Sequence, residues 1–224
     1  MSKKVMILDV EGISGKKPYN IGYIIGDNKG NIFMERSFAL PNNFWENLQN
    51  CFNAREMTHK NLQEILSDFG AGDMRKYEYI SNVDFISIFE NDLKTFDIKE
   101  IDAYNCNFDK SSIRNLYENR IMPDVEWCDI WSEVVYSRCL TKKYVKFCKE
   151  NGFVTDKGNI KTSAEVVYSY MTKNITFCEE HTGLADCGIE YELYLWAKSS
   201  KKKMVKKHPR QIWKVMAELV EKMD

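Results

Sequence analysis

Val5-Met6-Ile7-Leu8-Asp9-Val10-Glu11 is the stretch of sequence that decides the fold. It begins with a short, continuous apolar run, which predicts a strand that is buried on both faces. Alternate residues of a strand point to the same face, so Asp9 and Glu11 project together from the end of this strand. Two neighbouring carboxylates suit a hard divalent cation. Taken alone, the pair is also typical of a solvated strand end, because charged side chains are usually exposed.

The sequence after this strand predicts an antiparallel meander. Ile21–Gly26 and Ile32–Leu40 have strand character, and the turn-forming residues 27–31 join them. Farther along, short apolar strands alternate at first with segments whose apolar residues recur at helical spacing. We expect strands at Glu100–Tyr104 and Trp127–Ile130, and helices at Ser81–Phe96, Asp109–Glu118, Ser132–Asn151, Ser163–Met171, Cys187–Lys198 and Gln211–Met223. This order predicts an α/β fold with a mixed central sheet flanked by helices.

Length and composition favour one folded domain over the whole chain, 1–224. Of the 224 residues, 44% are apolar and 29% are charged, so both a sizeable core and a soluble surface are expected. Helical spacing of apolar residues indicates an insertion around 44–75, and a basic segment followed by a helix is expected at 198–224. The formal net charge is −1, so a site for a polyanion must be built from local basic patches.

The cysteines and histidines argue against disulfides and structural zinc. The chain has seven cysteines, an odd number with no C-x-x-C spacing, and it begins without a signal peptide. This pattern indicates a reducing, cytoplasmic environment. A structural zinc site would need closely spaced Cys/His pairs, and the chain has only three histidines, so such a site is not expected. The sequence also has no apolar run near the ~20 residues that span a bilayer, so no membrane partner is expected.

A second polar motif follows the expected strand Glu100–Tyr104. It reads Asn105-Cys106-Asn107-Phe108-Asp109, in which an acid stands at the start of an expected helix. Asp109 suits two roles equally. It is a metal ligand in one, and in the other it is an N-cap whose side chain accepts a helix N–H.

A third motif lies late in the chain, at His181-Thr182-Gly183-Leu184-Ala185-Asp186. Histidine is the usual proton acceptor near neutral pH, and the spacing allows His181 and Asp186 to face one cleft. A surface histidine followed by another N-cap is the simpler explanation of this motif alone. The Thr182-Gly183 pair also predicts a flexible backbone that lets His181 swing in when substrate is present.

The order of the three motifs resembles that of the DEDDh exonuclease superfamily. D-x-E comes first, N-x-x-F-D lies mid-chain and H-x-x-x-x-D comes late, so the resemblance covers roughly residues 5–197. Tyr19–Gly22 and Cys128–Ile130 also look like segments of that family, and residues 158–182 look similar to phage-type members from low-GC Gram-positive hosts. For such a phage-encoded protein, the host cytoplasm is the expected location.

The resemblance implies a ribonuclease-H-like fold, in which strands 1–3 are antiparallel and later strands parallel. It also implies a 3′→5′ exonuclease that uses two ions of Mg²⁺ or Mn²⁺. The implied metal ligands are Asp9, Glu11, Asp109 and Asp186, and the implied general base is His181.

The sequence departs from the family's pattern where the terminal nucleotide is gripped. Gly12-Ile13-Ser14 stands where the family usually has Thr or Ser after D-x-E, and Tyr104 stands where it often has His before the mid-chain Asn. The substrate-binding residues that the resemblance implies are Gly12 and Ile13, through their backbone N–H groups, and Asn105. These departures leave the choice of substrate more open than metal binding.

The expected substrate is the 3′ end of single-stranded DNA or RNA. Seven basic residues and no acid occur in 198–210, which suits phosphate contacts or a solvated surface: Lys198, Lys201, Lys202, Lys203, Lys206, Lys207 and Arg210. A catalytically weak or inactive exonuclease fold that binds nucleic acid or a protein is the alternative function. The apolar stripe of Gln211–Met223 fits packing on the domain or a dimer contact, so both a monomer and a homodimer remain open.

Overall fold

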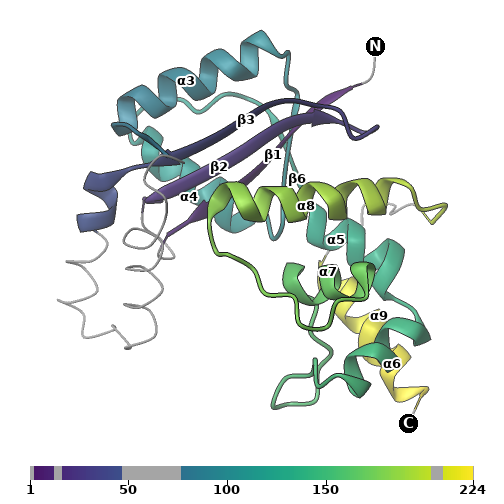
Figure 1. Ribbon diagram of the computed structural model, residues 1–224. Helices are drawn as coiled ribbons and strands as arrows, with labels where there is room; N and C mark the ends of the chain where they lie inside the picture. Colours follow the sequence, from purple (N-terminus) through teal and green to yellow (C-terminus); the bar gives the residue numbers. More distant parts are fainter. Residues whose placement is uncertain (1–2, 13–16, 47–76, 203–208, 224) are drawn as a thin grey trace. The chain divides into compact units, whose positions relative to one another are not determined.

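A computed structural model describes residues 3–12, 17–46, 77–202 and 209–223 (Figure 1). The chain divides into two compact units, and each is described here by itself. The first unit comprises Met1–Cys128 and Glu180–Gly188, and the second comprises Asp129–Glu179 and Ile189–Asp224. The single domain over 1–224 stays a prediction. Residues 41–46 are helical, whereas the rest of the expected insertion at 44–75 lies outside the described residues, as do residues 203–208 of the basic segment.

A six-stranded mixed sheet forms the centre of the first unit. Its strands are β1 (Lys4–Glu11), β2 (Asn20–Asp27), β3 (Ile32–Ala39), β4 (Glu78–Tyr79), β5 (Glu100–Ala103) and β6 (Glu126–Asp129). Their order across the sheet is β4-β3-β2-β1-β5-β6. β1, β2 and β3 pair antiparallel, while β5 pairs parallel with β1 and β4 parallel with β3. The predicted mixed α/β sheet, with strands 1–3 antiparallel, is therefore confirmed, and its topology is consistent with a ribonuclease-H-like fold.

The β2–β3 hairpin forms where the turn residues predicted it. The Asp27 carboxylate accepts hydrogen bonds from the backbone N–H groups of Lys29 (2.9 Å) and Asn31 (3.1 Å). Gly30 has a φ of 88°, a conformation that glycine adopts without steric cost. The side chain of Asp27 therefore adds to the backbone hydrogen bonds inside the turn and stabilises it.

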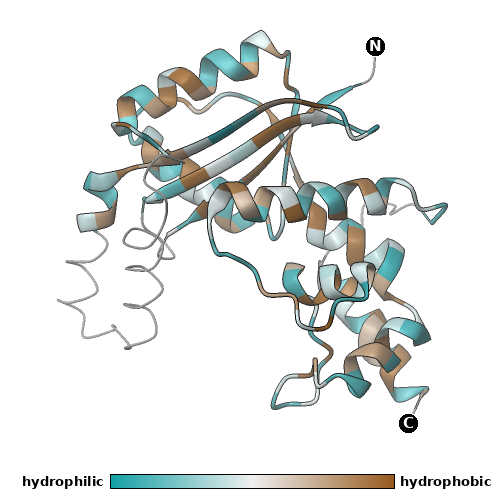
Figure 2. Ribbon diagram, viewed as in Figure 1, coloured by the Kyte–Doolittle hydropathy of each residue, from teal (hydrophilic) through white to brown (hydrophobic). Residues whose placement is uncertain are grey.

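One face of the sheet carries the main hydrophobic core. Alternate β1 residues, from Met6 to Val10, point to this face and pack with α3 (Asn82–Thr95) and α4 (Asn107–Tyr117). Figure 2 shows the apolar strands and the mixed hydropathy of the helices that cover them. The hydroxyl of Ser81 caps α3 by accepting the N–H of Asp84 at 3.1 Å, so α3 begins where the sequence predicted.

A buried polar network ties α3 to two strands of the sheet. Tyr23 donates its hydroxyl hydrogen to Asp92 (2.6 Å), and the Nε of Arg36 donates to the same carboxylate oxygen (2.9 Å). Arg36 also pairs with Glu78 at 3.1 Å. Burial, together with the hydrogen bond to Asp92, raises the pKa of Tyr23 far above its ordinary value. Tyr23 therefore remains a neutral hydrogen-bond donor in the folded protein.

The second unit is helical. It contains α5 (Ile130–Val134), the π-helical turn η2 (Val135–Cys139), α6 (Lys142–Glu150), α7 (Ala164–Thr172), the later part of α8 (Gly183–Lys198) and α9 (Pro209–Glu221). Within the described parts of the chain, no helix combines the length and the apolar character needed to cross a membrane.

The prediction of one continuous helix over Ser132–Asn151 is wrong. The chain leaves helical geometry at Leu140 and Thr141, and Thr141 is extended, with φ −142° and ψ 147°. The hydroxyl of Thr141 accepts the N–H of Tyr144 at 3.2 Å and so begins a new helix. A threonine that caps a helix competes with its continuation, and the apolar spacing on either side hides this break.

Candidate metal centre

Asp9 and Glu11 lie at the carboxyl end of β1, opposite Gly22 and Asn20 of β2. Both side chains are half-buried. Val10, between them, packs into the core with α3 and α4. Strand alternation therefore directs the two carboxylates to the other face of the sheet, together, as the spacing predicted.

The third motif places two more possible ligands, His181 and Asp186, close to the Glu11 carboxylate. One ligand atom from each of Glu11, His181 and Asp186 lies within 4.8 Å of the other two. Asp186 is only 8% exposed, and its N–H donates to the Thr182 carbonyl inside the first turn of α8. Because α8 begins at Gly183, Asp186 stands within the helix, and the alternative that it is an N-cap is wrong.

Asp109 reaches the same strand end from α4. It is 2% exposed, and its Oδ1 accepts the N–H of Val10, the residue between Asp9 and Glu11, at 3.3 Å. The N-cap of α4 is Cys106, so Asp109 is the third helical residue, and the N-cap alternative is wrong here too. The second motif is thereby joined to the first across 99 residues of sequence.

The start of α8 is held against β2 by a hydrogen bond and a close backbone contact. Gly183 N–H donates to Asn20 Oδ1 at 2.7 Å, while Asn20 Nδ2 donates to the Phe38 carbonyl at 2.8 Å. A Cβ placed on Gly22 would lie 2.2 Å from the Gly183 carbonyl carbon, and one on Gly183 would lie 2.5 Å from Gly22 N. Only glycines allow the two backbones to come this close.

The sequence analysis missed this contact. It took Tyr19–Gly22 as a resemblance in the second strand and Gly183 as a source of flexibility. A glycine within an apolar strand was the available signal, because it often marks a close backbone approach. Gly183 is buried and hydrogen-bonded, so the prediction of a flexible Thr182-Gly183 hinge is not supported by its packing.

The side chain of His181 lies close to the acids Glu11 and Asp186. Its backbone has a φ of 55°, a left-handed conformation that non-glycine residues adopt infrequently. One of its ring nitrogens lies within 4.8 Å of oxygens of both Glu11 and Asp186, although the residue as a whole is exposed. Whether His181 swings in when substrate binds stays a prediction.

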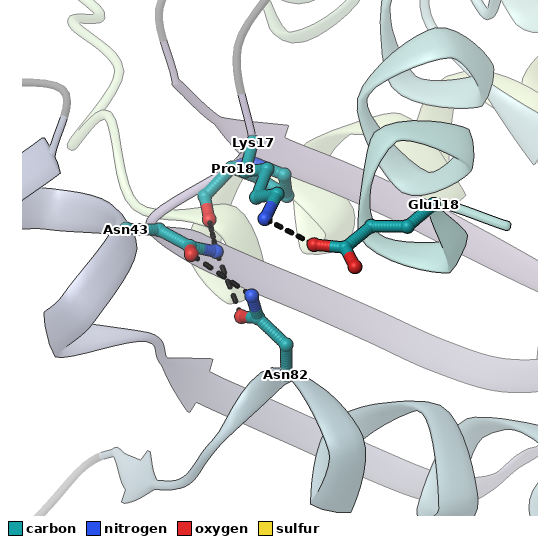
Figure 3. Close-up of polar contacts among 5 residues, drawn as sticks. All are labelled: Lys17, Pro18, Asn43, Asn82 and Glu118. Atoms are coloured by element: carbon teal, nitrogen blue, oxygen red, sulfur yellow. Dashed lines mark hydrogen bonds and ion pairs between the residues drawn. The ribbon is translucent and has the colours of Figure 1, made fainter.

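Hydrogen bonds fix the end of the segment that follows Glu11 (Figure 3). Asn43 Nδ2 donates to the Pro18 carbonyl (2.7 Å) and to Asn82 Oδ1 (2.9 Å), and Asn82 Nδ2 donates back to Asn43 Oδ1 (3.0 Å). Beside them, Lys17 pairs with Glu118 at 2.6 Å. The ion pair lowers the pKa of Glu118, mainly through its hydrogen bond with Lys17. The Pro18 carbonyl is therefore held by Asn43, which follows β3 in the chain, and Asn43 is held in turn by Asn82 of α3.

The predicted substrate-binding residues are only partly described. Gly12 is half-buried, and a Cβ on it would lie 3.2 Å from the Pro18 Cα, whereas Ile13 lies outside the described residues. Asn105 is exposed, has a φ of 64° and accepts the Phe108 N–H at 3.1 Å. It thus shapes the turn between β5 and α4. The role of each in binding substrate stays a prediction.

The donor set fits a divalent cation. Carboxylate oxygens are the ligands that Mg²⁺ prefers, and imidazole is an additional ligand for Mn²⁺ or Zn²⁺. Glu11, His181 and Asp186 offer these donors close together, and Asp109 joins the same strand end through the Val10 amide. Which ions these residues hold stays a prediction.

A second group of possible ligands lies on β5 and β6. One ligand atom from each of Glu100, Glu126 and Cys128 lies within 4.8 Å of the others. Lys3 pairs with Glu100 at 2.5 Å, and this hydrogen bond is the main reason that the pKa of Lys3 is raised. Sequence analysis did not find this cluster, because Glu100 lies on another strand from Glu126 and Cys128 and no motif joins them.

No protein-family model matches this sequence, and no curated protein is significantly similar to it. The resemblance to the DEDDh superfamily therefore rests on the three motifs and their order along the chain.

Proposed function

We propose that this protein is a metal-dependent 3′→5′ exonuclease that hydrolyses phosphodiester bonds at the 3′ end of single-stranded nucleic acid. The observation that carries the proposal is the convergence of three distant motifs at one end of β1. Glu11, His181 and Asp186 bring their ligand atoms within 4.8 Å of one another, and Asp109 binds the Val10 amide at 3.3 Å. A mixed sheet with this strand order supports the same proposal at the level of the fold.

Asp9, Glu11, Asp109 and Asp186 would hold the two ions, Mg²⁺ or Mn²⁺. Bound cations of this kind polarise the phosphate and make a bound water more acidic. The carboxylates would otherwise repel one another, so bound cations should stabilise the folded protein. Asp109 and Asp186 are buried, and the Val10 N–H holds Oδ1 of Asp109 in place.

His181 would accept the proton of the attacking water. It must be neutral to do so, because only a neutral imidazole has a lone pair free to accept a proton. The exposure of the residue leaves room for a substrate and its water beside the ring.

One exposed aromatic side chain, that of Trp45, is linked through the buried rings of Phe44 and Tyr19 to the same end of the sheet and suits an unpaired strand. The Tyr19 N–H binds the Glu11 carbonyl at 3.0 Å, and the Tyr19 ring packs edge-on against Phe44, with centroids 5.9 Å apart. Phe44 in turn contacts Trp45, which is 63% exposed. Nucleobases stack on such rings with little dependence on sequence, which supports a single-stranded substrate.

The test is degradation of single-stranded DNA and RNA oligonucleotides labelled at the 3′ or the 5′ end, with Mg²⁺ or Mn²⁺. We expect products that shorten from the 3′ end, and none with EDTA. Asp186→Asn and His181→Ala should each lower the rate by about 1,000-fold, which corresponds to roughly 4 kcal/mol in the barrier.

Glu100→Gln is the matched control, because it removes a buried carboxylate from the second cluster and should leave the rate unchanged. Intact oligonucleotides under every metal condition would reject the exonuclease. Binding of the same oligonucleotides without cleavage would instead favour an inactive module on this fold.

A further inference from the structure

We propose that, before substrate binds, Glu11, His181 and Asp186 together bind one late transition-metal ion such as Zn²⁺ or Co²⁺, with His181 as a direct ligand. The inference rests on the metal site of the proposed function but not on nuclease activity. It changes the role of His181, which the exonuclease mechanism uses only as a base.

The positions of the three donors carry the inference. They already lie within 4.8 Å of one another. Ligands about 2.0–2.2 Å from a zinc ion lie roughly 3.2–3.6 Å apart around a tetrahedron. Small side-chain rotations therefore bring one nitrogen and two carboxylate oxygens onto a single ion, with a fourth position left for water.

One side chain holds the three donors in this arrangement. Asn20 pairs in register with Glu11 on the neighbouring strand, and its Oδ1 accepts the Gly183 N–H at 2.7 Å. Gly183 stands two residues after His181 and three before Asp186, and it cannot move toward β2 because it already touches Gly22. The relative positions of the strand ligand and the two ligands around the start of α8 are thus set before any ion arrives.

The chemistry of the donors selects the ion. Mg²⁺ prefers oxygen ligands and keeps several of its waters, whereas imidazole suits Zn²⁺, Co²⁺ and related ions. An imidazole nitrogen that is bound to a metal has no lone pair left to accept a proton. A bound Zn²⁺ would therefore hold His181 away from the attacking water, and Zn²⁺ would act as an inhibitor of the Mg²⁺-dependent reaction.

The experiment measures Zn²⁺ and Mg²⁺ binding to the full-length protein without nucleic acid, together with the ¹⁵N signals of the imidazole rings. The chain has only three histidines, so each ring can be assigned. The seven cysteines offer other zinc ligands, which makes the ring signal of His181 the decisive measurement. We expect Zn²⁺ to shift that signal and Mg²⁺ to leave it unchanged.

His181→Asn is the variant to compare, because asparagine tolerates the left-handed backbone of this position. We expect it to weaken Zn²⁺ binding by roughly 10- to 100-fold or more and to leave Mg²⁺ binding unchanged. Cys128→Ser, which removes the thiol of the second cluster, is the control and should leave the His181 shift intact.

A His181 signal that Zn²⁺ does not shift, or Zn²⁺ binding equally tight in His181→Asn, would overturn the inference. The two proposals fail separately. An inactive protein that binds Zn²⁺ through His181 rejects the exonuclease alone, while an active one whose Zn²⁺ affinity ignores His181 rejects this inference alone.

Discussion

Two ligand clusters of the first unit share the same pattern of burial and differ in their ligand types. Each combines a buried acid, a half-buried group and an exposed group: Asp186, Glu11 and His181 in the first, Glu100, Cys128 and Glu126 in the second. In the second, the Lys3 ammonium pairs with Glu100. A protein can neutralise a group of carboxylates with its own lysine or with an ion from solution. That the second cluster is structural and the first holds a cation stays a prediction.

The backbone beneath the first cluster gives the largest expected effect. Gly22→Ala places a methyl group 2.2 Å from the backbone of Gly183, and neither backbone can move aside easily. We expect a loss of about 3 kcal/mol or more in the free energy of unfolding, at the upper end of overpacking effects, measured by urea denaturation.

Gly188→Ala is the matched control for that substitution. It lies in the same helix as Gly183, but an added Cβ meets nothing within 4 Å. Alanine is the better helix former by about 1 kcal/mol, so this variant should be as stable as the parent or more so. If Gly22→Ala and Gly188→Ala destabilised the protein equally, the close contact between β2 and α8 would not be the cause of the loss in Gly22→Ala.

Metal-dependent stabilisation is the next effect in size. At a Mn²⁺ concentration 100 times the Kd, an ion that binds only the folded protein adds about 2.7 kcal/mol to the free energy of unfolding. We expect Mn²⁺ to raise the Tm of the parent and of Glu100→Gln, but not that of Asp186→Asn. If Mn²⁺ raised the Tm of Asp186→Asn but not that of Glu100→Gln, the second cluster and not the first would be the cation site.

The Lys3–Glu100 pair gives the smallest effect. The side chain of Lys3 is 61% exposed, so solvent screens the pair, and Lys3→Gln should cost less than about 1 kcal/mol. The pKa of Lys3 is raised in the folded protein, so this contribution is complete below the ordinary lysine value of 10.5 and is lost as the pH rises through the folded-state pKa.

Urea denaturation of the parent and of Lys3→Gln, at pH 8 and at increasing pH above 10, tests this prediction. The two proteins should converge at high pH. Lys99→Gln, which breaks a pair exposed on both sides, should have a smaller effect at every pH. A stability difference that grows with pH would contradict the sign.

Local patterns predicted most of the elements of the fold. The helix expected at Ser81–Phe96 is α3 with its two capping residues included, because a serine cap and apolar spacing are both encoded locally. The break at Thr141 escaped prediction, since a threonine that caps a helix is not distinguishable by spacing from one inside a helix.

The candidate site was predictable only in part. The order of the motifs suggested that Glu11, His181 and Asp186 lie together, and their ligand atoms do lie close. That these residues bind metal or catalyse hydrolysis stays a prediction. The contacts of Asn20 with Gly183 and of Lys3 with Glu100 join residues 163 and 97 positions apart, so no local pattern contains them.

The contact between Gly22 and Gly183 also determines which positions of the site tolerate substitution. No side chain fits at either position, and Asn20 is the link that aligns β2 with α8. In contrast, the Pro18 carbonyl accepts a hydrogen bond from the Asn43 amide, which pairs with the Asn82 amide, independently of that contact. Any set of variants of this site should therefore keep Asn20, Gly22 and Gly183 constant.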